Sequence, residues 1–408
     1  MRILHLNTHA SGGSYEYAAL LSSALAEQGI ESHVLCKNTR GKGARFFLNR
    51  LIRRASVSLS REPWHGTRRL LEPPAPNEFG EVDIVHLHTV ADWFDVPDWL
   101  ETLPTDVGVV ISLHDMWHFT GGCFLYRGCT LYSGICTPCP ILKTPLNRVL
   151  AKDEQRRKLQ AYAGRRVRFV ANSRWLANLA EQSPIVKARG GARVIPPGID
   201  TAVFKPQDKA ECRAELTIPA DSFVIAAGAA SLTDENKNIP WLLEQLSRVP
   251  TAENVMVALA GEGIVPVPKG VNVRFVGNPV NRRERARVFA AADVFVSSSL
   301  METYGLTLIE AMACGTPVVA FRVGGIPEAA PDGQGAIICD RQDSAALLEA
   351  VTTLRDSKHL RETLGNAGHE MVHTRNGLRS FAQAFMRLYE ECVPPARTPF
   401  DGRSALAA

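Results

Sequence analysis

The sequence predicts an α/β fold made of two doubly wound domains, each with a parallel sheet covered by helices on both faces. Short runs rich in β-branched residues alternate with helical patterns along most of the 408 residues, and this alternation is typical of parallel sheets. The series ends near residue 200 and begins again after "PPGIDTAVFKP", which indicates a second domain. Ligands of such domains lie beyond the carboxyl ends of the strands.

The first domain is predicted to cover residues 1–200. Its first strand, "RILHLN", is followed by a glycine turn and by a helix, "SYEYAALLSSALAEQG", that ends at a glycine. Glycine just after the last periodic residue is a common end of a helix. The further strands expected in this domain are 31–36, 82–88, 107–115, 166–173 and 192–198.

The second domain is predicted to cover residues 201–375. Its expected strands are 222–229, 254–263, 271–278, 293–299, 316–325 and 335–340. A last helix, within 376–393, carries one apolar stripe and is expected to pack across the domain junction. The stripe consists of Phe381, Phe385, Leu388, Tyr389 and Cys392. The tail 394–408 lacks periodicity and is predicted to be flexible.

The composition is that of an ordinary globular protein, with 45% hydrophobic and 22% charged residues. The net charge of +4 indicates no particular partner, and no nucleic-acid partner is predicted. Apolar runs fall short of the roughly 18 residues that span a membrane, and the N-terminus is not typical of a signal peptide. A cytoplasmic location is therefore expected, in which the nine cysteines would be thiols or metal ligands rather than disulfides.

Two glutamates lie eight positions apart in the apolar stretch "SLMETYGLTLIEAMACGTPVV". A helix is expected to begin at Gly305, and the unsatisfied N–H groups of a helix start favour an anion. We expect the phosphates of a nucleoside diphosphate sugar to contact Gly305, Leu306 and Thr307. Glu302 would hold the sugar hydroxyls, and Glu310, roughly 7 Å along the helix, would accept from the ribose diol. The alternative is a core glutamate that a local backbone group satisfies.

The longer segment "SSLMETYGLTLIEAMACGTPVVAFRVGGIPE" resembles the nucleotide-sugar signature of family 4 glycosyltransferases. These are retaining enzymes with two facing Rossmann-like domains, the GT-B fold. The resemblance extends from the N-terminus to about Leu388. It implies that the first domain faces the acceptor and the second binds the nucleotide sugar. It also implies that Glu302 contacts the donor sugar and that Glu310 contacts the ribose.

The segment "GAASLTDENKNIPWLL" resembles the phosphate loop of this family, in which an arginine and a lysine clamp the diphosphate. Lys237 matches the lysine and would act in catalysis, because charge stabilisation of the departing phosphate is often the largest catalytic contribution. The arginine position holds Ala229 or Ala230 instead. Arg274 or Arg322 could replace the missing cation. Otherwise Lys237 and the helix start would act alone, or Lys237 would simply be a solvated lysine.

Two loops of the first domain lie where ligands are expected. Gly12 and Gly13, in "HASGGSYEY", match the family loop beside the donor diphosphate, although glycines in such a turn can have a purely conformational role. His114, in "ISLHDMW", matches the histidine that touches the transferred sugar in the family, with Asp115 orienting it; a structural histidine is the alternative. His88 is a candidate contact for the acceptor.

Four cysteines follow the "HDMW" motif within "TGGCFLYRGCTLYSGICTPCP". The final C-x2-C spacing lets two thiolates reach one ion, and four thiolates in a short loop favour structural zinc. An iron–sulfur cluster and free or redox-active thiols are the alternatives. A subgroup of the family that makes bacterial surface polysaccharides, of the colanic-acid type, carries a similar insert. The four residues are Cys123, Cys129, Cys136 and Cys139.

The segment 37–69 contains ten lysines and arginines and one acid, interleaved with apolar residues. On a helix, this pattern is typical of a surface that binds anionic lipid. A lipid-linked acceptor would give such a surface a use. The alternative is a solvated helix of the first domain.

The resemblance implies a retaining transferase that moves a hexose from a nucleoside diphosphate to a saccharide or lipid-linked saccharide in surface polysaccharide synthesis. The reaction would need no cofactor, and the departing phosphate would take the acceptor's proton. A nucleotide-sugar epimerase of the same shape and a non-catalytic sugar-nucleotide-binding subunit are the alternatives. A dehydrogenase is disfavoured, because neither first strand is followed by the dinucleotide-binding glycine pattern and its acidic residue.

Overall fold

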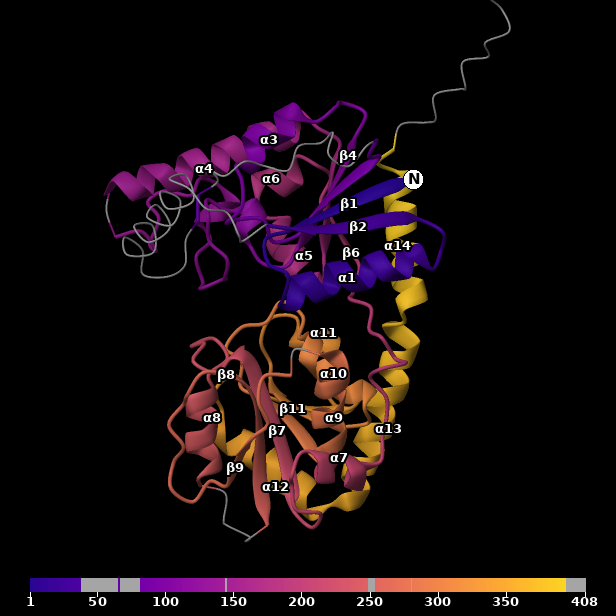
Figure 1. Cartoon of the computed structure of the whole chain (residues 1–408). Coiled ribbons are helices and arrows are strands. Elements are labelled where there is room, and N and C mark those ends of the chain that lie inside the picture. The colour runs from indigo at the N-terminus through magenta and orange to yellow at the C-terminus, as the bar shows by residue number, and fades with distance from the viewer. Residues whose placement is uncertain (38–64, 67–80, 144, 249–253, 280, 394–408) are drawn as a thin grey trace, which may run out of the picture.

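The computed structural model describes residues 1–37, 65–66, 81–143, 145–248, 254–279 and 281–393. It shows two parallel-sheet domains, one above the other in Figure 1, that are connected near residue 200 and again through the C-terminal helices. The predicted fold class, two facing Rossmann-like domains with a helix crossing their junction, is confirmed.

The sheet of the first domain has the strand order β2-β1-β3-β4-β5-β6. Its central strands β3 and β4 are buried along their whole length, because helices cover both faces of the sheet. The strands are β1 (Arg2–Asn7), β2 (Glu31–Cys36), β3 (Ile84–Leu87), β4 (Gly108–Leu113), β5 (Val167–Ala171) and β6 (Ala192–Val194). The α-helices described here are α1 (Gly13–Ala26), α3 (Val96–Thr102), α4 (Pro145–Ala163), α5 (Arg174–Ala180) and α6 (Pro184–Lys187), with short 3-10 turns at Trp117–Phe119 and Leu131–Ser133.

The sheet of the second domain has the order β12-β11-β10-β7-β8-β9. The strands are β7 (Phe223–Ser231), β8 (Val255–Glu262), β9 (Val273–Phe275), β10 (Val294–Ser297), β11 (Val318–Phe321) and β12 (Ala336–Cys339). The helices are α7 (Lys209–Glu215), α8 (Ile239–Leu246), α9 (Arg282–Ala291), α10 (Leu306–Ala313), α11 (Ile326–Ala329), α12 (Ser344–Asp356) and α13 (Lys358–Arg375). In both sheets the parallel pairing brings the carboxyl ends of the strands to one end of the sheet. In Figure 1, β7 of the second sheet runs towards the first domain.

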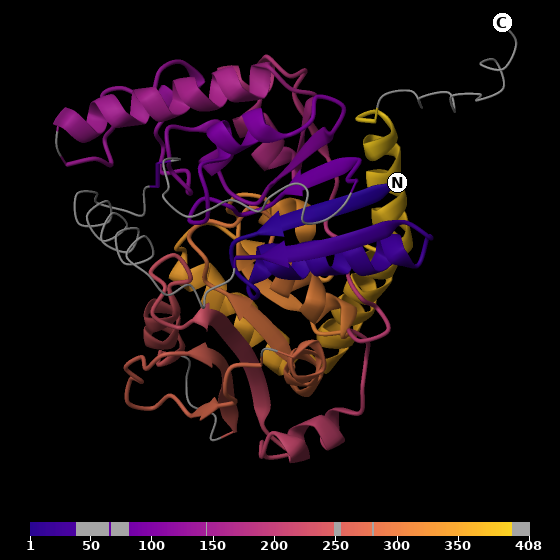
Figure 2. The same cartoon turned by 45° about the horizontal axis from the view of Figure 1, so that its top comes forward.

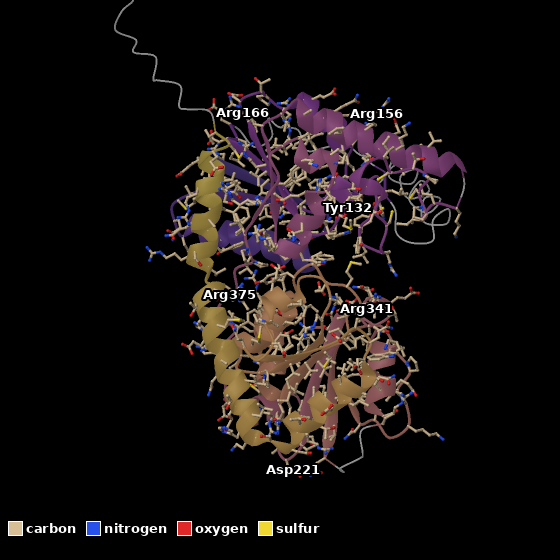
Figure 3. The ribbon with its side chains drawn as sticks, turned by 180° about the vertical axis from the view of Figure 1, so that it is seen from behind. Tyr132, Arg156, Arg166, Asp221, Arg341 and Arg375 are labelled. Atoms are coloured by element: carbon tan, nitrogen blue, oxygen red, sulfur yellow. The ribbon has the colours of Figure 1, made fainter. Side chains whose placement is uncertain are left out.

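The last two helices connect the second domain back to the first. Helix α13 lies along the second domain and ends at Arg375, which Figure 3 shows at the level of the junction. Helix α14 (Leu378–Glu390) then packs against α1, and the views in Figures 1 and 2 both place it beside the N-terminal end of the chain. Its predicted apolar stripe is buried in the core of the first domain together with Ile3 and Tyr17.

Hydrogen bonds between side chains and backbone fix the two domains at the junction. The side-chain amide of Asn376 donates to the carbonyl of Pro197 at 2.8 Å and to the hydroxyl of Tyr304 at 3.1 Å. The carboxylate of Glu328, on α11, accepts from the backbone N–H groups of Arg174 and Trp175 at 2.6 and 2.7 Å. A glutamate of the second domain therefore caps helix α5 of the first. Its negative charge also interacts favourably with the positive end of the helix dipole.

Two predicted segments lie largely or wholly outside the described residues. These are the basic segment 37–69, of which the structure describes Lys37, His65 and Gly66, and the tail 394–408. Within the part of the chain that is described, no helix is both long enough and apolar enough to cross a membrane.

Candidate active site

A cavity of about 440 Å³ lies between the two domains. The first domain contributes the β1–α1 loop and the first turn of α1, including Gly12, Gly13 and Glu16. The second contributes the ends of β7 and β8, one face of α9 and the start of α10. The two walls approach closely, since a Cβ atom added to Gly13 would lie 3.7 Å from a methyl carbon of Leu306.

The start of α10 forms one wall of this cavity. Gly305, the residue before the helix, has a φ of 103°, a backbone conformation that glycine adopts easily and other residues rarely. No side chain caps the helix, so its opening N–H groups, at Leu306 and Thr307, suit an anion. Leu306, Thr307 and Glu310 all line the cavity, so with Gly12 and Gly13 five of the residues predicted to bind the donor come together here.

Glu310 is buried on α10, and its partner is an arginine of α9. Arg285 donates to the two carboxylate oxygens at 3.1 and 3.4 Å. Burial raises the pKa of Glu310, and the positive charge of Arg285 acts in the opposite direction. Arg285 also lies 3.8 Å from Glu16 of the first domain, whose carboxylate accepts from Arg282 at 2.7 Å. Two arginines of α9 therefore join a glutamate of each domain across the cavity.

Lys237 and Glu302 form a second ion pair, with 2.6 Å between Nζ and Oε2. Burial lowers the pKa of Lys237, but the charge and hydrogen bond of Glu302 outweigh it and raise the pKa above its usual value, so the lysine is charged. The turn at Gly324 and Gly325 packs on the backbone of Glu302. A Cβ atom at Gly324 would lie 1.8 Å from its carbonyl oxygen. Only glycine fits there, so this turn fixes the position of the glutamate.

Arg274 and Arg322, one of the two alternatives for the missing arginine, do not lie at the cavity. Ala229 and Ala230 line the cavity where the clamp arginine was expected. Arg274 instead donates to the carbonyl of Leu216, and Arg322 pairs with Asp340. Neither lines the cavity; the arginine in its lining is Arg285.

His114 lies just beyond β4, but Asp115 does not orient it. The carboxylate of Asp115 accepts from the backbone N–H of Trp117 at 2.7 Å, and burial raises the pKa of Asp115 to about 6. His114 Nε2 lies 3.0 Å from Nδ1 of His88, and the ring packs edge-on against Tyr17. His88 is 1% exposed, so the interpretation of His88 as an acceptor contact is also wrong.

The four cysteines of the predicted insert line one cavity of about 210 Å³ in the first domain. Burial raises the pKa of the Cys123 thiol to about 12 and that of Cys136 to about 11. No three of the four sulfurs lie within 4.8 Å of one another. The residues predicted to bind zinc are therefore neighbours, with their sulfurs further apart than in a closed tetrahedral site.

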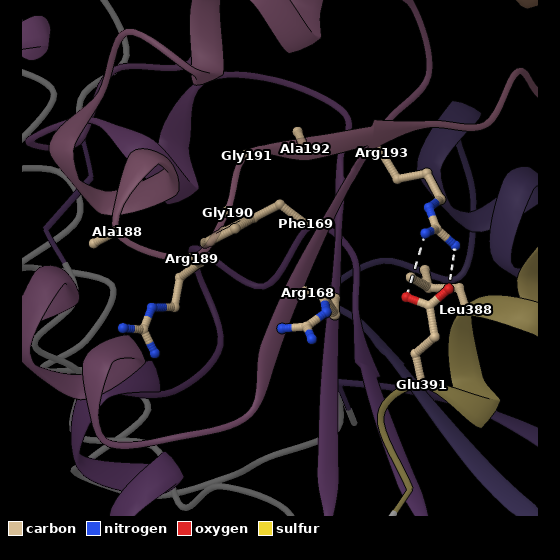
Figure 4. A pocket seen from close by; sticks show the side chains of 10 residues that line it. All are labelled: Arg168, Phe169, Ala188, Arg189, Gly190, Gly191, Ala192, Arg193, Leu388 and Glu391. Carbon is tan, nitrogen blue, oxygen red and sulfur yellow. Dashed lines mark hydrogen bonds and ion pairs between the residues drawn. The ribbon is translucent and has the colours of Figure 1, made fainter.

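A larger cavity, of about 570 Å³, lies away from the junction at the β5–β6 edge of the first sheet. Figure 4 shows Arg168, Arg189 and Arg193 around it, with Arg193 paired to Glu391 at 2.8 Å. All of its lining belongs to the first domain and the end of α14. It cannot bring residues of the two domains to one ligand, so we take the cavity at the junction as the candidate active site.

The sequence analysis did not predict the ion pairs that Glu16 forms with Arg282 and Arg285. One signal was available: Glu16 follows the Gly12–Gly13 loop by one helical turn, so it had to lie near any ligand of that loop. The run "RRERAR" gave no indication of which arginine faces the cavity.

Curated relatives match this chain over parts of different length. A "D-inositol 3-phosphate glycosyltransferase 2" of Catenulispora acidiphila is 26% identical over 96% of this chain and 92% of its own length. A "D-inositol 3-phosphate glycosyltransferase" of Mycobacteroides abscessus is 36% identical over a shorter part, 36% of this chain and 34% of its own. None of these relatives is named as a colanic-acid-type enzyme.

Solved structures share the fold. A sucrose-phosphate synthase from Thermosynechococcus elongatus has a TM-score of 0.68 at 20% identity, covering 96% of this chain and 98% of its own. The Anabaena protein Alr3699/HepE, solved in complex with UDP-glucose, has a TM-score of 0.60 at 15% identity, covering 96% and 100%.

Two family models match successive parts of the chain. "Glycosyltransferase Family 4" matches residues 11–203 and "Glycosyl transferases group 1" matches residues 223–357. The two matches coincide with the two sheets and together cover most of the chain. The chain therefore belongs to the glycosyltransferases of the GT-B fold.

Proposed function

We propose that this glycosyltransferase binds a nucleoside diphosphate sugar in the cavity between its domains and transfers the sugar to an acceptor on the first domain. The observation that supports this most strongly is the lining of the cavity. An uncapped helix start suited to a diphosphate, a buried carboxylate and a glycine loop of the facing domain meet there.

Each group has a role that follows from its chemistry. The N–H groups of Leu306 and Thr307 would bind the diphosphate, and Lys237 would neutralise charge as the phosphate departs. Glu302 and Glu310 would accept hydrogen bonds from the sugar and ribose hydroxyls, exchanging part of their pairing with Lys237 and Arg285 for the ligand. The departing phosphate would take the proton of the acceptor, so the proposed reaction is retaining and needs no metal ion or cofactor.

A hexose is the proposed donor sugar, supported by the UDP-glucose complex of Alr3699/HepE. The proposed acceptor is a saccharide or lipid-linked saccharide of a surface polysaccharide, supported by the cysteine insert. The relatives named for D-inositol 3-phosphate make that compound a second acceptor to test. A lipid-linked acceptor would agree with the basic composition of 37–69, which we propose contacts an anionic membrane surface from the cytoplasmic side.

The donor can be tested by thermal unfolding with a panel of nucleotide sugars that includes UDP-glucose. A nucleotide sugar at about one hundred times its dissociation constant should stabilise the protein by about 2.7 kcal/mol. The matched control is the Thr307→Pro variant, which lacks one of the helix-start N–H groups and should respond less. If no nucleotide sugar stabilises the wild-type protein, the proposed donor is wrong. If a donor is consumed equally without any acceptor, an epimerase or a hydrolase is favoured instead.

We also propose that the four cysteines bind one structural zinc ion. Four thiols around one cavity are a donor set that zinc prefers, although their sulfurs would have to draw together. Metal analysis of the purified protein should find about one zinc per chain, and Cys139→Ser should lower both the zinc content and the unfolding temperature. The control is Cys212→Ser, in the second domain, which should retain the zinc. A protein free of zinc would contradict the proposal, and iron in its place would favour a cluster.

A further inference from the structure

Two buried imidazoles, those of His88 and His5, connect His114 to Ser32 on the edge strand β2 of the first sheet. Ser32 lies on β2, His5 on β1, His88 just after β3 and His114 just after β4, on neighbouring strands of the sheet. Along this path, each ring lies within hydrogen-bond distance of the next. His114 Nε2 lies 3.0 Å from His88 Nδ1, His88 Nε2 lies 3.1 Å from His5 Nδ1, and His5 Nε2 lies 3.0 Å from Ser32 Oγ. We call this series, with Ser22 at its end, the imidazole chain.

The two serines at the end of the imidazole chain determine which atom donates in each of its hydrogen bonds. The hydroxyl of Ser22 donates to the backbone carbonyl of Ser32, and the hydroxyl of Ser32 donates to Ser22 Oγ at 3.0 Å. The one proton of Ser32 is thereby used, so Ser32 Oγ accepts a hydrogen bond from the ring of His5. His5 must then have its proton on Nε2.

A neutral imidazole has one N–H, so a ring that donates from Nε2 must accept at Nδ1. The tautomer of His5 therefore determines the tautomers of His88 and His114. His5 Nδ1 accepts from Nε2–H of His88, and His88 Nδ1 accepts in turn from Nε2–H of His114. Burial supports the neutral state: it lowers the pKa of His5 to about 3 and that of His114 to about 4. The pKa of His88 is also lowered well below its usual value, by burial and then by the neighbouring histidines.

We propose that the imidazole chain holds His114 in the tautomer with its proton on Nε2, and thereby presents the bare Nδ1 as an acceptor to a hydroxyl of the donor sugar. Among the described residues, the hydrogen bonds of His114 show no partner for Nδ1. Ser22, His5 and His88 are then positioning residues, since they act through His114 and do not touch the sugar. The contact with the sugar rests on the proposed function and on the family resemblance, which places His114 at the transferred sugar, since His114 itself is not among the residues that line the cavity. The tautomer can be measured without any ligand.

A metal ion is the competing explanation for part of this cluster. Donor atoms of His5, His86 and His88 all lie within 4.8 Å of one another. However, His86 already bonds to the hydroxyls of Tyr389 and Ser112 at 2.7 and 2.8 Å. A metal on His5 and His88 would need the nitrogens that the imidazole chain uses, so the two explanations exclude each other.

The test is NMR of the full-length protein with ¹⁵N-labelled histidine, in which long-range couplings distinguish pyrrole-type from pyridine-type ring nitrogens. His114→Gln assigns the signals of His114. We expect pyrrole-type Nε2 and pyridine-type Nδ1 for His114, His88 and His5 at neutral pH. A pyrrole-type Nδ1 at His114, a charged His114 ring, or metal bound to His5 and His88 would overturn the proposal.

Variants of Ser22 test whether the serine end sets the tautomer. In Ser22→Ala, Ser32 loses its acceptor and can donate to His5, so the His114 signals should change partly or wholly to pyrrole-type Nδ1. Ser22→Thr keeps the hydroxyl and should restore the wild-type signals. Ser23→Ala, at an exposed neighbour on the same helix, should leave them unchanged. Unaltered ring signals in a folded Ser22→Ala protein would show that the chain does not fix His114.

The functional consequence is measured separately with UDP-glucose as the probe. If the tautomer is as expected and UDP-glucose binds, Ser22→Ala should weaken its binding several-fold and Ser22→Thr should not. If the tautomer is as expected and no nucleotide sugar binds, the proposed function fails while the assignment of the tautomer stands. If UDP-glucose binds the wild-type and Ser22→Ala proteins equally despite a changed tautomer, the proposed acceptor role of Nδ1 is wrong.

Discussion

Lys237→Ala is expected to lower turnover at saturating donor by about 100- to 1,000-fold, the loss typical of removing one group that stabilises developing charge. The reason is that Ala229 and Ala230 line the cavity at the position of the clamp arginine, so Lys237 is the one member of the clamp that the sequence retains. Lys237 also holds Glu302 at 2.6 Å, so its loss would free the carboxylate that is proposed to bind the sugar.

The measurement is the initial rate with the donor and acceptor that the ligand panels identify. Lys237→Arg keeps the charge and should retain more activity than Lys237→Ala. Lys269→Ala, at an exposed lysine of the same domain, should be as active as the wild type. Unchanged turnover of Lys237→Ala at saturating donor would remove this lysine from the mechanism.

Arg285→Met is expected to lower the free energy of unfolding by about 3–5 kcal/mol, because it leaves Glu310 buried without its partner. Burial already raises the pKa of Glu310, and Arg285 opposes that rise. Without Arg285 the pKa rises further above the value of the unfolded chain. The carboxyl group then favours folding at low pH, and this contribution is lost as the pH rises through the folded-state pKa. The deficit relative to the wild type should therefore be larger at about pH 8 than at about pH 5.

Chemical denaturation at the two pH values measures this effect. Arg283→Met, at an exposed arginine of the same helix, should show a small deficit that does not depend on pH. The double variant Arg285→Met/Glu310→Leu removes both charges and should recover most of the lost stability. A deficit of Arg285→Met that is equal at both pH values would show that Glu310 does not cause it.

The fold was predictable because its signals are local. Strands such as "VVISL" in β4 are mostly apolar and are buried on both faces, and "LTLIEAMA" in α10 is bounded by Gly305 and Gly315. These patterns depend on neighbours within one element, so the sequence contains them directly. The restart after residue 200 indicated the second domain for the same reason.

The partners of the site residues were not predictable in this way. Glu310 and Arg285 lie 25 residues apart on different helices, and Lys237 and Glu302 lie 65 residues apart. Such pairs form through tertiary packing, about which helical or strand periodicity says nothing. Asp115 follows His114 directly, yet its carboxylate accepts from the backbone of Trp117 in the bend after β4. His88, just after the adjacent strand, contacts the ring of His114 instead.

A crystal structure of the protein with UDP tests the central claim most directly. The account predicts the diphosphate within about 3.2 Å of the backbone nitrogens of Leu306 and Thr307, beside the Gly12–Gly13 loop, with the ribose at Glu310. A nucleotide bound elsewhere, for example in the cavity around Arg168 and Arg189, would contradict it.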